Sequence, residues 1–356
     1  MNRPVHGGNL AWAAKLAGCS PNAILDFSAS INPLGPPQSA IAAIGSHLSV
    51  LTAYPDPDYF SLRLALSQVH QLPPEWIIPG NGAAELLTWA GRDLSNLAAT
   101  CLVTPAFGDY WRSLKAFNAT VLECRLDWEH GKFPIPKSLD LSRSGLLINN
   151  PHNPTGKLFS RETILPYLEE FALVVVDEAF MDFLPPDEEQ SLIGMVQNYP
   201  NLVVVRSLTK FYSLPGLRLG YAIAHPDRIR RWQQWRDPWS VNTLAVAAGV
   251  AVLQDREFQQ QTLDWLKPAK DKLFRGLTAL SGLHPYESAA NFLLVQSTQP
   301  SSLLQEKLLK HSKILIRDCL SFPELGDRFF RVAVRSLEEN QRLLEGLASE
   351  QLTLDS

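Results

Sequence analysis

Cysteine is scarce in this chain of 356 residues, and long apolar runs and blocks of like charge are missing. The cysteines lack CxxC or other metal-type spacing, so we expect reduced structural thiols and no metal site: Cys19, Cys101, Cys124 and Cys319. No apolar run approaches the roughly 20 residues that a membrane span needs, and the first residues lack the apolar core of a secretory signal. The formal net charge of −4 gives no basis for a nucleic acid or an anionic membrane as partner. We therefore expect a soluble, cytoplasmic protein that binds small molecules.

The chain is longer than the size at which a single hydrophobic core usually stops growing, so we expect two domains. Residues 1–45 are predicted to form an N-terminal arm and part of a small domain. Residues 46–255 are predicted to form a large domain, and residues 256–356 the C-terminal part of the small domain. The proline-rich segments "INPLGPP" and "YPDPDY" are predicted to be short loops.

Short apolar runs alternate with helical patterns along much of the chain. The runs "TCLVTP", "GLLINNP", "ALVVVDEAF", "NLVVVRS" and "RLGYAIA" do not alternate with polar residues, which is typical of strands buried on both faces. Helical patterns cover residues 83–97 and about 241–280, and the runs "NFLLVQS", "ILIRD" and "FFRVAVR" come later. This order predicts an α/β fold with a mostly parallel sheet covered by helices, followed by a smaller α+β domain.

Polar side chains follow three of the predicted strands at the point where each strand ends. Asp177 ends "VVVDEAF", Lys210 follows "VVVRS", and asparagines, among them Asn153, end "LLINNPHNPTG". Because ligands bind at the carboxyl ends of strands in open α/β sheets, we expect one crevice to hold all three kinds of group. Taken singly, the acid could cap a turn, "NPTG" could be an ordinary turn, and the lysine could be a solvated surface charge.

An acid, an amide and an amine in one crevice suit a particular cofactor. An amine forms a Schiff base with an aldehyde, and a carboxylate keeps a pyridine nitrogen protonated so that the ring accepts electrons. These requirements indicate pyridoxal 5′-phosphate. Ser207 and Arg218 flank the lysine as phosphate donors. The segment "GNGAAELL" predicts a helix with Gly82 as N-cap, so the N–H groups of Ala83 and Ala84 would point at the anion.

The segments "NNPHNPTG", "VVVDEAFMDF" and "SLTKFYSLPGLRLGY", in this order, resemble the fold-type I aminotransferase superfamily of pyridoxal-phosphate enzymes, in the branch of the histidinol-phosphate aminotransferases. The resemblance covers nearly the whole chain and implies a large domain with a mostly parallel seven-stranded sheet. It implies that Lys210 binds the cofactor covalently, that Asp177 pairs with the pyridine nitrogen, and that Asn153 donates to the 3′ oxygen. Phe107, in "TPAFGDY", matches the aromatic residue that stacks on the ring. Tyr54, in "AYPDPDY", matches a tyrosine donated to the neighbouring subunit's phosphate, which implies a homodimer.

The N-terminal part refines this resemblance. "HGGN" at residues 6–9, followed by "DFSASINPLGPP", resembles the threonine-phosphate decarboxylases, the cobalamin-pathway members of the branch. Gly7 and Gly8 would let backbone N–H groups approach an anion, and His6 would add a donor, so we expect a lid over a substrate phosphate. The same resemblance makes Asn32 a contact of the substrate carboxylate. Phe180 replaces a tyrosine that many aminotransferases have, which weakens the expectation of efficient transamination.

Arginines on two predicted C-terminal strands supply further anion-binding groups. By the resemblance, Arg331 binds the substrate carboxylate, for which the planar guanidinium is suited. Arg317 matches an arginine that meets the distal phosphate of phosphorylated substrates. Arg335 lies two pleat repeats from Arg331 on the same face and is a further candidate, with a surface salt bridge as the alternative.

Two activities remain open on these residues. The leading hypothesis is decarboxylation of L-threonine O-3-phosphate to (R)-1-amino-2-propanol O-2-phosphate for cobalamin biosynthesis, because an anchored substrate phosphate can turn the carboxylate out of the ring plane. The alternative is an aminotransferase that acts on histidinol phosphate or a related amino acid. A non-catalytic binding module would not need Lys210.

Overall fold

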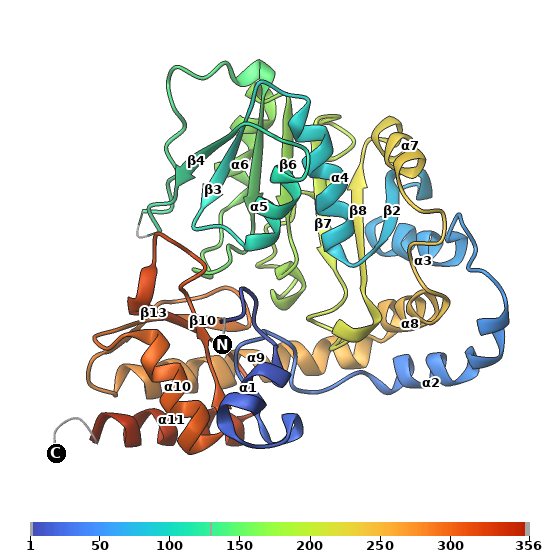
Figure 1. The fold of residues 1–356 in the computed structure, drawn as a ribbon. Helices are drawn as coiled ribbons and strands as arrows, with labels where there is room; N and C mark the ends of the chain where they lie inside the picture. The colour runs from blue at the N-terminus through green and yellow to red at the C-terminus, as the bar shows by residue number, and fades with distance from the viewer. Residues whose placement is uncertain (1–2, 129, 353–356) are drawn as a thin grey trace.

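The computed structural model describes residues 3–128 and 130–352, which form a larger and a smaller lobe (Figure 1). The larger lobe contains a seven-stranded sheet in the order β2 (Ile77–Asn81), β8 (Leu219–Ala224), β7 (Leu202–Ser207), β6 (Leu173–Asp177), β5 (Ser144–Asn149), β3 (Ala99–Thr104) and β4 (Val121–Arg125). Strands β3 to β7 pair in parallel, so the predicted mostly parallel sheet is confirmed. Strand β8 is antiparallel to both of its neighbours. The short connection 208–218 leaves no room for the crossover that a parallel β8 would need.

Helices cover both faces of this sheet (Figure 1). One face packs against α4 (Ala83–Ser95), α5 (Gly108–Lys115) and α7 (Pro226–Trp235). The other packs against α3 (Phe60–His70), α6 (Arg161–Glu170) and α8 (Thr243–Gln254). In β6, Val174 and Val176 belong to the second core, whereas Leu173 and Val175 belong to the first. This burial on both faces explains why the strands read as continuous apolar runs.

The smaller lobe is built around an antiparallel sheet in the order β12 (Arg317–Asp318), β13 (Phe329–Ala333), β10 (Phe292–Ser297) and β9 (Leu283–Pro285). Its helices are α9 (Arg256–Thr278), α10 (Ser301–Ser312) and α11 (Leu337–Leu352). The N-terminal segment joins this lobe, because α1 (Leu10–Ala17) packs on α10 and β1 (Leu25–Asp26) pairs with β11 (Ile314–Leu315). Helix α2 (Gln38–Ser46) then packs on α8 of the larger lobe. The domain boundaries at residues 45 and 255 stay a prediction.

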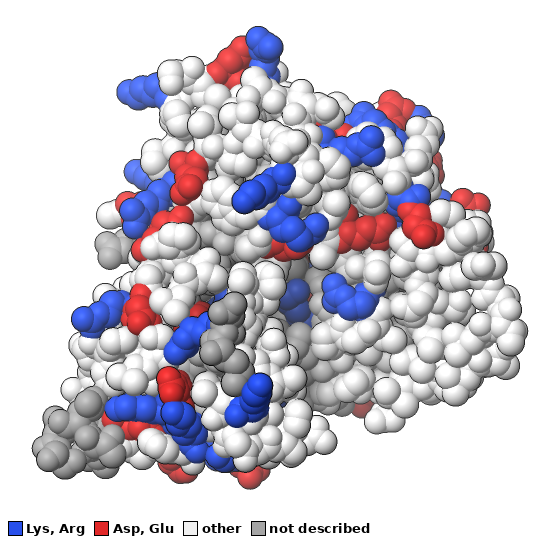
Figure 2. Space-filling model, in the orientation of Figure 1, with Lys and Arg blue, Asp and Glu red and all other residues white. Residues whose placement is uncertain are grey.

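Charged side chains of both signs are interspersed over the face shown in Figure 2, and basic side chains are visible in the hollow between the lobes. Within residues 3–128 and 130–352, no helix combines the length and the apolar character that crossing a membrane requires.

Candidate active site

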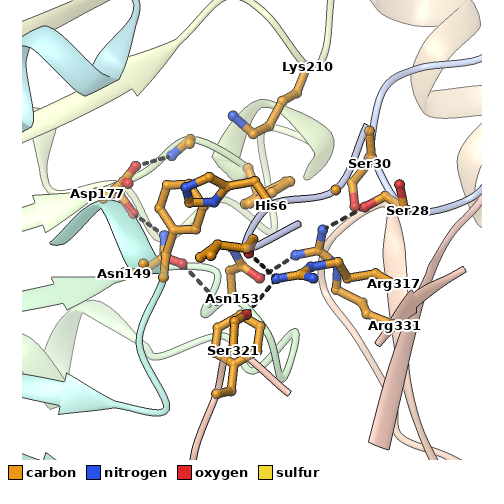
Figure 3. Close-up of a pocket in the computed structure, with 18 of the residues that line it drawn as sticks. His6, Ser28, Ser30, Asn149, Asn153, Asp177, Lys210, Arg317, Ser321 and Arg331 are labelled. Atoms are coloured by element: carbon orange, nitrogen blue, oxygen red, sulfur yellow. Dashed lines mark hydrogen bonds between the residues drawn. The ribbon is translucent and has the colours of Figure 1, made fainter. Parts of the chain in front are cut away.

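A cavity between the two lobes collects the polar side chains that follow the central strands (Figure 3). Eight of the predicted site residues line it: His6, Gly7, Phe107, Asn153, Asp177, Lys210, Arg317 and Arg331. Others that line it were not predicted to be part of the site: Ser28, Ser30, Tyr110, Asn149, Phe180 and Ser321. The carboxyl ends of β5, β6 and β7 therefore meet residues of the smaller lobe and of the N-terminal segment in one place.

Lys210 supplies the amine of this cavity. Its Nζ lies over the Phe180 ring, 5.3 Å from the ring centre. Phe180 is the apolar residue at the position where many aminotransferases have a tyrosine. Burial lowers the pKa of Lys210, Asp177 opposes this shift, and the charges of Arg218 and Arg331 add to it. A lowered pKa increases the fraction of neutral amine, which is the form that attacks an aldehyde.

The Asp177 carboxylate is held by two donors. Tyr110 Oη donates to Asp177 Oδ2 over 2.7 Å, and the backbone N–H of Ala179 donates to Oδ1 over 2.9 Å. Burial raises the pKa of Asp177, whereas the Tyr110 hydroxyl, the Lys210 charge and the Ala179 N–H act in the opposite direction. Asn149 donates to the Asp177 carbonyl and accepts from the Asn153 N–H, so both strand ends are tied together.

We predict that Tyr110→Phe shifts the pH dependence of pyridoxal phosphate retention. In the role that the resemblance implies, Asp177 would pair with the pyridine nitrogen as a carboxylate, and this ionised form is lost as the pH falls through the pKa of Asp177. Without the Tyr110 hydroxyl this pKa rises further, so retention should begin to fail at a higher pH and be weaker by about three- to tenfold at neutral pH. Cofactor release monitored by absorbance as a function of pH measures the shift.

Tyr167→Phe provides the matched control, because Tyr167 lies on α6 and packs against Phe133 away from the cavity. The control should keep the wild-type profile. A Tyr110→Phe profile that coincides with the wild type would contradict the assigned role of this hydroxyl.

The start of α4 forms a cradle for an anion. Gly82 is the N-cap, as predicted, and has a φ of 76°, which favours glycine. A Cβ at Gly82 would lie 2.4 Å from Nη2 of Arg218, so only glycine lets this guanidinium approach the helix start. Ala83 and Ala84 open the helix, and their N–H groups have no partner within its first turn.

Ser207 lies beside this cradle. It pairs in the sheet with Gly220, where a Cβ would come within 2.7 Å of the Ala83 nitrogen. The Ser207 and Thr209 hydroxyls lie 2.8 Å apart. A helix N-terminus, hydroxyl groups and the Arg218 guanidinium are the donor set that a phosphate monoester needs, so the residues present fit the phosphate of pyridoxal 5′-phosphate.

Two arginines lie side by side on the smaller-lobe side of the cavity. Arg317 on β12 is directly opposite Arg331 on β13, and their exposed fractions are 6% and 8%. Arg331 donates to Asn153 Oδ1 and to the carbonyl of Ser28, and its Nε has no hydrogen-bond partner in the described part of the chain. Burial, followed by the Arg317 charge, lowers the pKa of Arg331 to about 10. Two buried like charges in contact with a cavity suit a ligand with two anionic groups.

Residues 3–9, which we call the strap, pass over this arginine pair. The His6 ring lies 5.5 Å from the Phe107 ring, centre to centre. A Cβ at Gly7 would lie 2.3 Å from the carbonyl oxygen of Ser28, so only glycine can pass there. The N–H of Gly8 donates to Ser28 Oγ over 2.7 Å. The strap thus brings the predicted lid residues, from the opposite end of the chain, to Arg317, the arginine predicted to bind the substrate phosphate.

Three predicted residues belong neither to the lining of this cavity nor to the strap or the anion cradle at the start of α4. Asn32 is buried and donates to the Phe211 carbonyl and the Thr262 hydroxyl. Arg335 pairs with Glu339 over 2.9 Å, the salt bridge that was its alternative role. Tyr54 is 79% exposed and stacks on Trp239. The predicted substrate and cofactor roles of these three residues stay predictions.

A protein-family model matches most of the chain. The model for aminotransferase class I and II covers residues 22–347. The chain belongs to this family. Among curated members it is 40% identical to a threonine-phosphate decarboxylase of Salmonella typhimurium over 96% of this chain and 95% of that protein. It is 32% identical to an adenosylcobalamin biosynthesis bifunctional protein of Leptospira interrogans, over 98% of this chain and 41% of that protein.

A solved structure of the family also matches closely. The histidinol-phosphate aminotransferase of Clostridium acetobutylicum superposes with a TM-score of 0.84 at 28% identity, over 93% of this chain and 100% of that one. The fold-type I architecture and the resemblance to the aminotransferase superfamily are therefore confirmed.

The local sequence gives only weak indications that the unpredicted side chains belong to the site. Tyr110 lies one helical turn after Phe107 in "TPAFGDYW", so the two share a helix face. Ser28 and Ser30 alternate in "DFSASINP", which places both on one side of an extended segment. Nothing in the local sequence says which partner each would meet.

Proposed function

We propose that this protein is a cytoplasmic, pyridoxal-phosphate-dependent lyase that decarboxylates L-threonine O-3-phosphate to (R)-1-amino-2-propanol O-2-phosphate for cobalamin biosynthesis. The observation that carries the proposal is the buried pair Arg317 and Arg331 beneath the strap, because this substrate carries a phosphate and a carboxylate. The 40% identity to a threonine-phosphate decarboxylase supports the same reaction.

The residues of the larger lobe hold the cofactor in this proposal. Bound pyridoxal 5′-phosphate accepts the electron pair of the bond that breaks at the substrate Cα. Asp177 would pair with the pyridine nitrogen, and Phe107 would pack against the ring. The start of α4, together with Ser207 and Arg218, binds the phosphate.

The residues of the smaller lobe and the strap orient the substrate. Arg331 binds the carboxylate, and Arg317 with the His6 and Gly7 segment binds the substrate phosphate. Two anchors fix the rotation about Cα, so the carboxylate can be turned out of the ring plane and placed for loss of CO₂. The Lys210 amine then holds the proton that is returned to Cα. Phe180 offers no hydroxyl near this amine, so Lys210 or a water molecule would return the proton.

Transamination of histidinol phosphate is the second candidate activity. The same cofactor residues serve a histidinol-phosphate aminotransferase, and a solved aminotransferase of this kind has the same fold at 28% identity. Transamination requires the Cα–H bond, rather than the carboxylate, to be perpendicular to the ring.

The deciding experiment separates the two reactions. The purified protein loaded with pyridoxal 5′-phosphate is incubated with O-phospho-L-threonine, and separately with histidinol phosphate and 2-oxoglutarate, and the products are identified by mass spectrometry. We expect CO₂ and 1-amino-2-propanol phosphate from the first mixture and no glutamate from the second. An intact protein that releases no CO₂ but forms glutamate is the aminotransferase.

We also propose a homodimer that shares residues across its interface. The segment from α2 to α3 exposes large apolar side chains, and Tyr54 lies among them: Ile41, Leu48, Val50, Leu51, Phe60 and Leu64. An exposed apolar surface of this kind is typical of a protein interface. A second copy packed here would bring Tyr54 to the cofactor phosphate of its neighbour.

We predict that Tyr54→Phe weakens cofactor retention and leaves the fold intact, because its hydroxyl is exposed within one chain. Mixed dimers test the sharing. A subunit with Lys210→Ala supplies an intact Tyr54 to a Tyr54→Phe subunit with an intact Lys210, so one complete site is restored. Activity of the mixture above that of both parents is the expected result. No gain, with Tyr54→Phe itself impaired, would contradict sharing.

A further inference from the structure

The strap is tied to the smaller lobe by its first described residue. Arg3 Nη1 donates to Gln305 Oε1 over 2.7 Å and to Asp318 Oδ2 over 3.2 Å, and Nη2 donates to the Ser302 carbonyl over 2.9 Å. The Asp318 side chain is only 4% exposed, and that of Arg3 is 32% exposed. A charged hydrogen bond to a buried carboxylate holds its geometry better than a surface ion pair does.

The acceptor of this ion pair is shared with the arginine assigned to the substrate phosphate. Asp318 Oδ1 lies 3.5 Å from Nη1 of Arg317, while Oδ2 faces Arg3. Arg317 Nη2 in turn donates to the carbonyl of Val5, within the strap, and to the hydroxyl of Ser321. One chain of contacts therefore runs from Arg3 through Asp318 and Arg317 back to the middle of the strap.

The strap has little else to hold it over the cavity. Within the described residues, the other hydrogen bonds of its side chains and N–H groups are at its far end, where Gly8 donates to Ser28 and Asn9 caps α1. Toward the larger lobe, the His6 ring lies 5.5 Å from the Phe107 ring, and a Cβ at Gly108 would come within 3.3 Å of His6 Cε1. An incoming phosphate would compete with the Val5 carbonyl for the Arg317 guanidinium. The hydrogen bonds of Arg3 go to other groups, so they can persist while the ligand is bound.

We propose that Arg3 is a positioning residue that latches the strap over the phosphate-binding end of the cavity through Asp318. The latch keeps His6 and the Gly7 N–H in reach of the substrate phosphate while Arg317 turns its donors to that phosphate. This inference rests on the proposed function only in that the ligand carries a phosphate monoester. Losing the latch lowers the affinity for the phosphorylated substrate and leaves the chemistry at Cα unchanged.

The test combines kinetics with hydrogen exchange. With O-phospho-L-threonine, Arg3→Ala should raise KM about three- to tenfold and change kcat by less than about twofold. The variant loses a partly buried charged contact but keeps every group at the reacting atoms. Arg3→Lys should restore part of the loss, since it keeps the charge but not the fork. A change in Arg3→Ala that lowers kcat and the melting temperature but not the affinity would overturn the latch.

Hydrogen exchange of residues 4–9 tests the latch without turnover. Inorganic phosphate, added to the loaded protein, should slow exchange in the wild type and do so several-fold less in Arg3→Ala. Arg230→Ala is the matched control, because it also removes an arginine ion pair, the exposed one with Asp227 on α7 of the larger lobe. Equal exchange in the wild type and Arg3→Ala would overturn the proposal.

A double-mutant cycle identifies the acceptor. If Arg3 acts through Asp318, the double variant Arg3→Ala/Asp318→Asn should raise KM no more than the more impaired single variant does. Fully additive losses would overturn the pairing. Protection of the strap by phosphate in a protein that releases no CO₂ from O-phospho-L-threonine would leave the latch standing and reject the decarboxylase, so the two failures are distinguishable.

Discussion

Lys210→Ala is expected to abolish turnover altogether. Lys210 follows β7, its pKa is lowered by burial, and its Nζ is the amine that stands over the Phe180 ring in the cavity. In the proposed reaction, removing it would delete both the covalent attachment of the cofactor and a group that returns a proton to Cα. The fold should survive, because the Lys210 side chain makes no hydrogen bond within the described residues. Turnover of O-phospho-L-threonine, measured as CO₂ release, is the readout.

Borohydride reduction provides the control for this prediction. In the wild type loaded with pyridoxal 5′-phosphate, reduction should bleach the yellow protein and place the added mass on the peptide that contains Lys210. The Lys210→Ala protein should carry no such label. Label on another lysine, or activity that persists in the variant, would reject the assignment.

Arg331→Ala is expected to lower kcat/KM about ten- to a hundredfold, because a charged hydrogen-bonded contact contributes roughly 1.5–3 kcal/mol. The buried Arg331 guanidinium has an unpartnered Nε in the described chain and faces the cavity. Arg331→Lys should recover little, since an ammonium group lacks the planar fork that matches a carboxylate. Steady-state kinetics with O-phospho-L-threonine measures both variants.

Arg335→Ala is the matched control, on the chain segment that directly follows β13. Arg335 pairs with Glu339 and donates to the Asp26 carbonyl, and it does not line the cavity. Its replacement should change kcat/KM by less than about threefold, the size expected for a surface ion pair. A loss as large as that of Arg331→Ala would show that the substrate reaches Arg335 and would contradict the placement described here.

The helix-covered sheet and the polar groups at its carboxyl edge could be predicted from the sequence. Apolar runs of β-branched residues can be buried on both faces only in a helix-covered sheet, and ligands bind where such strands end. Asp177, Asn153 and Lys210 were therefore predicted to meet, and they line one cavity. The helix start at Gly82 was equally predictable, because its signals lie within a few neighbouring residues.

The contacts between residues far apart in the sequence could be seen only in the three-dimensional structure. Tyr110 meets Asp177, Arg317 lies opposite Arg331, and Arg3 reaches Asp318 across the length of the chain. Such pairs depend on how the lobes pack and on strand register, and a local sequence pattern carries no information about either. Periodicity placed Arg335 on the same face as Arg331, but Arg335 pairs with Glu339, in the first turn of α11, and does not line the cavity. Local patterns thus specify elements and their ends, whereas long-range packing specifies the partners of each side chain.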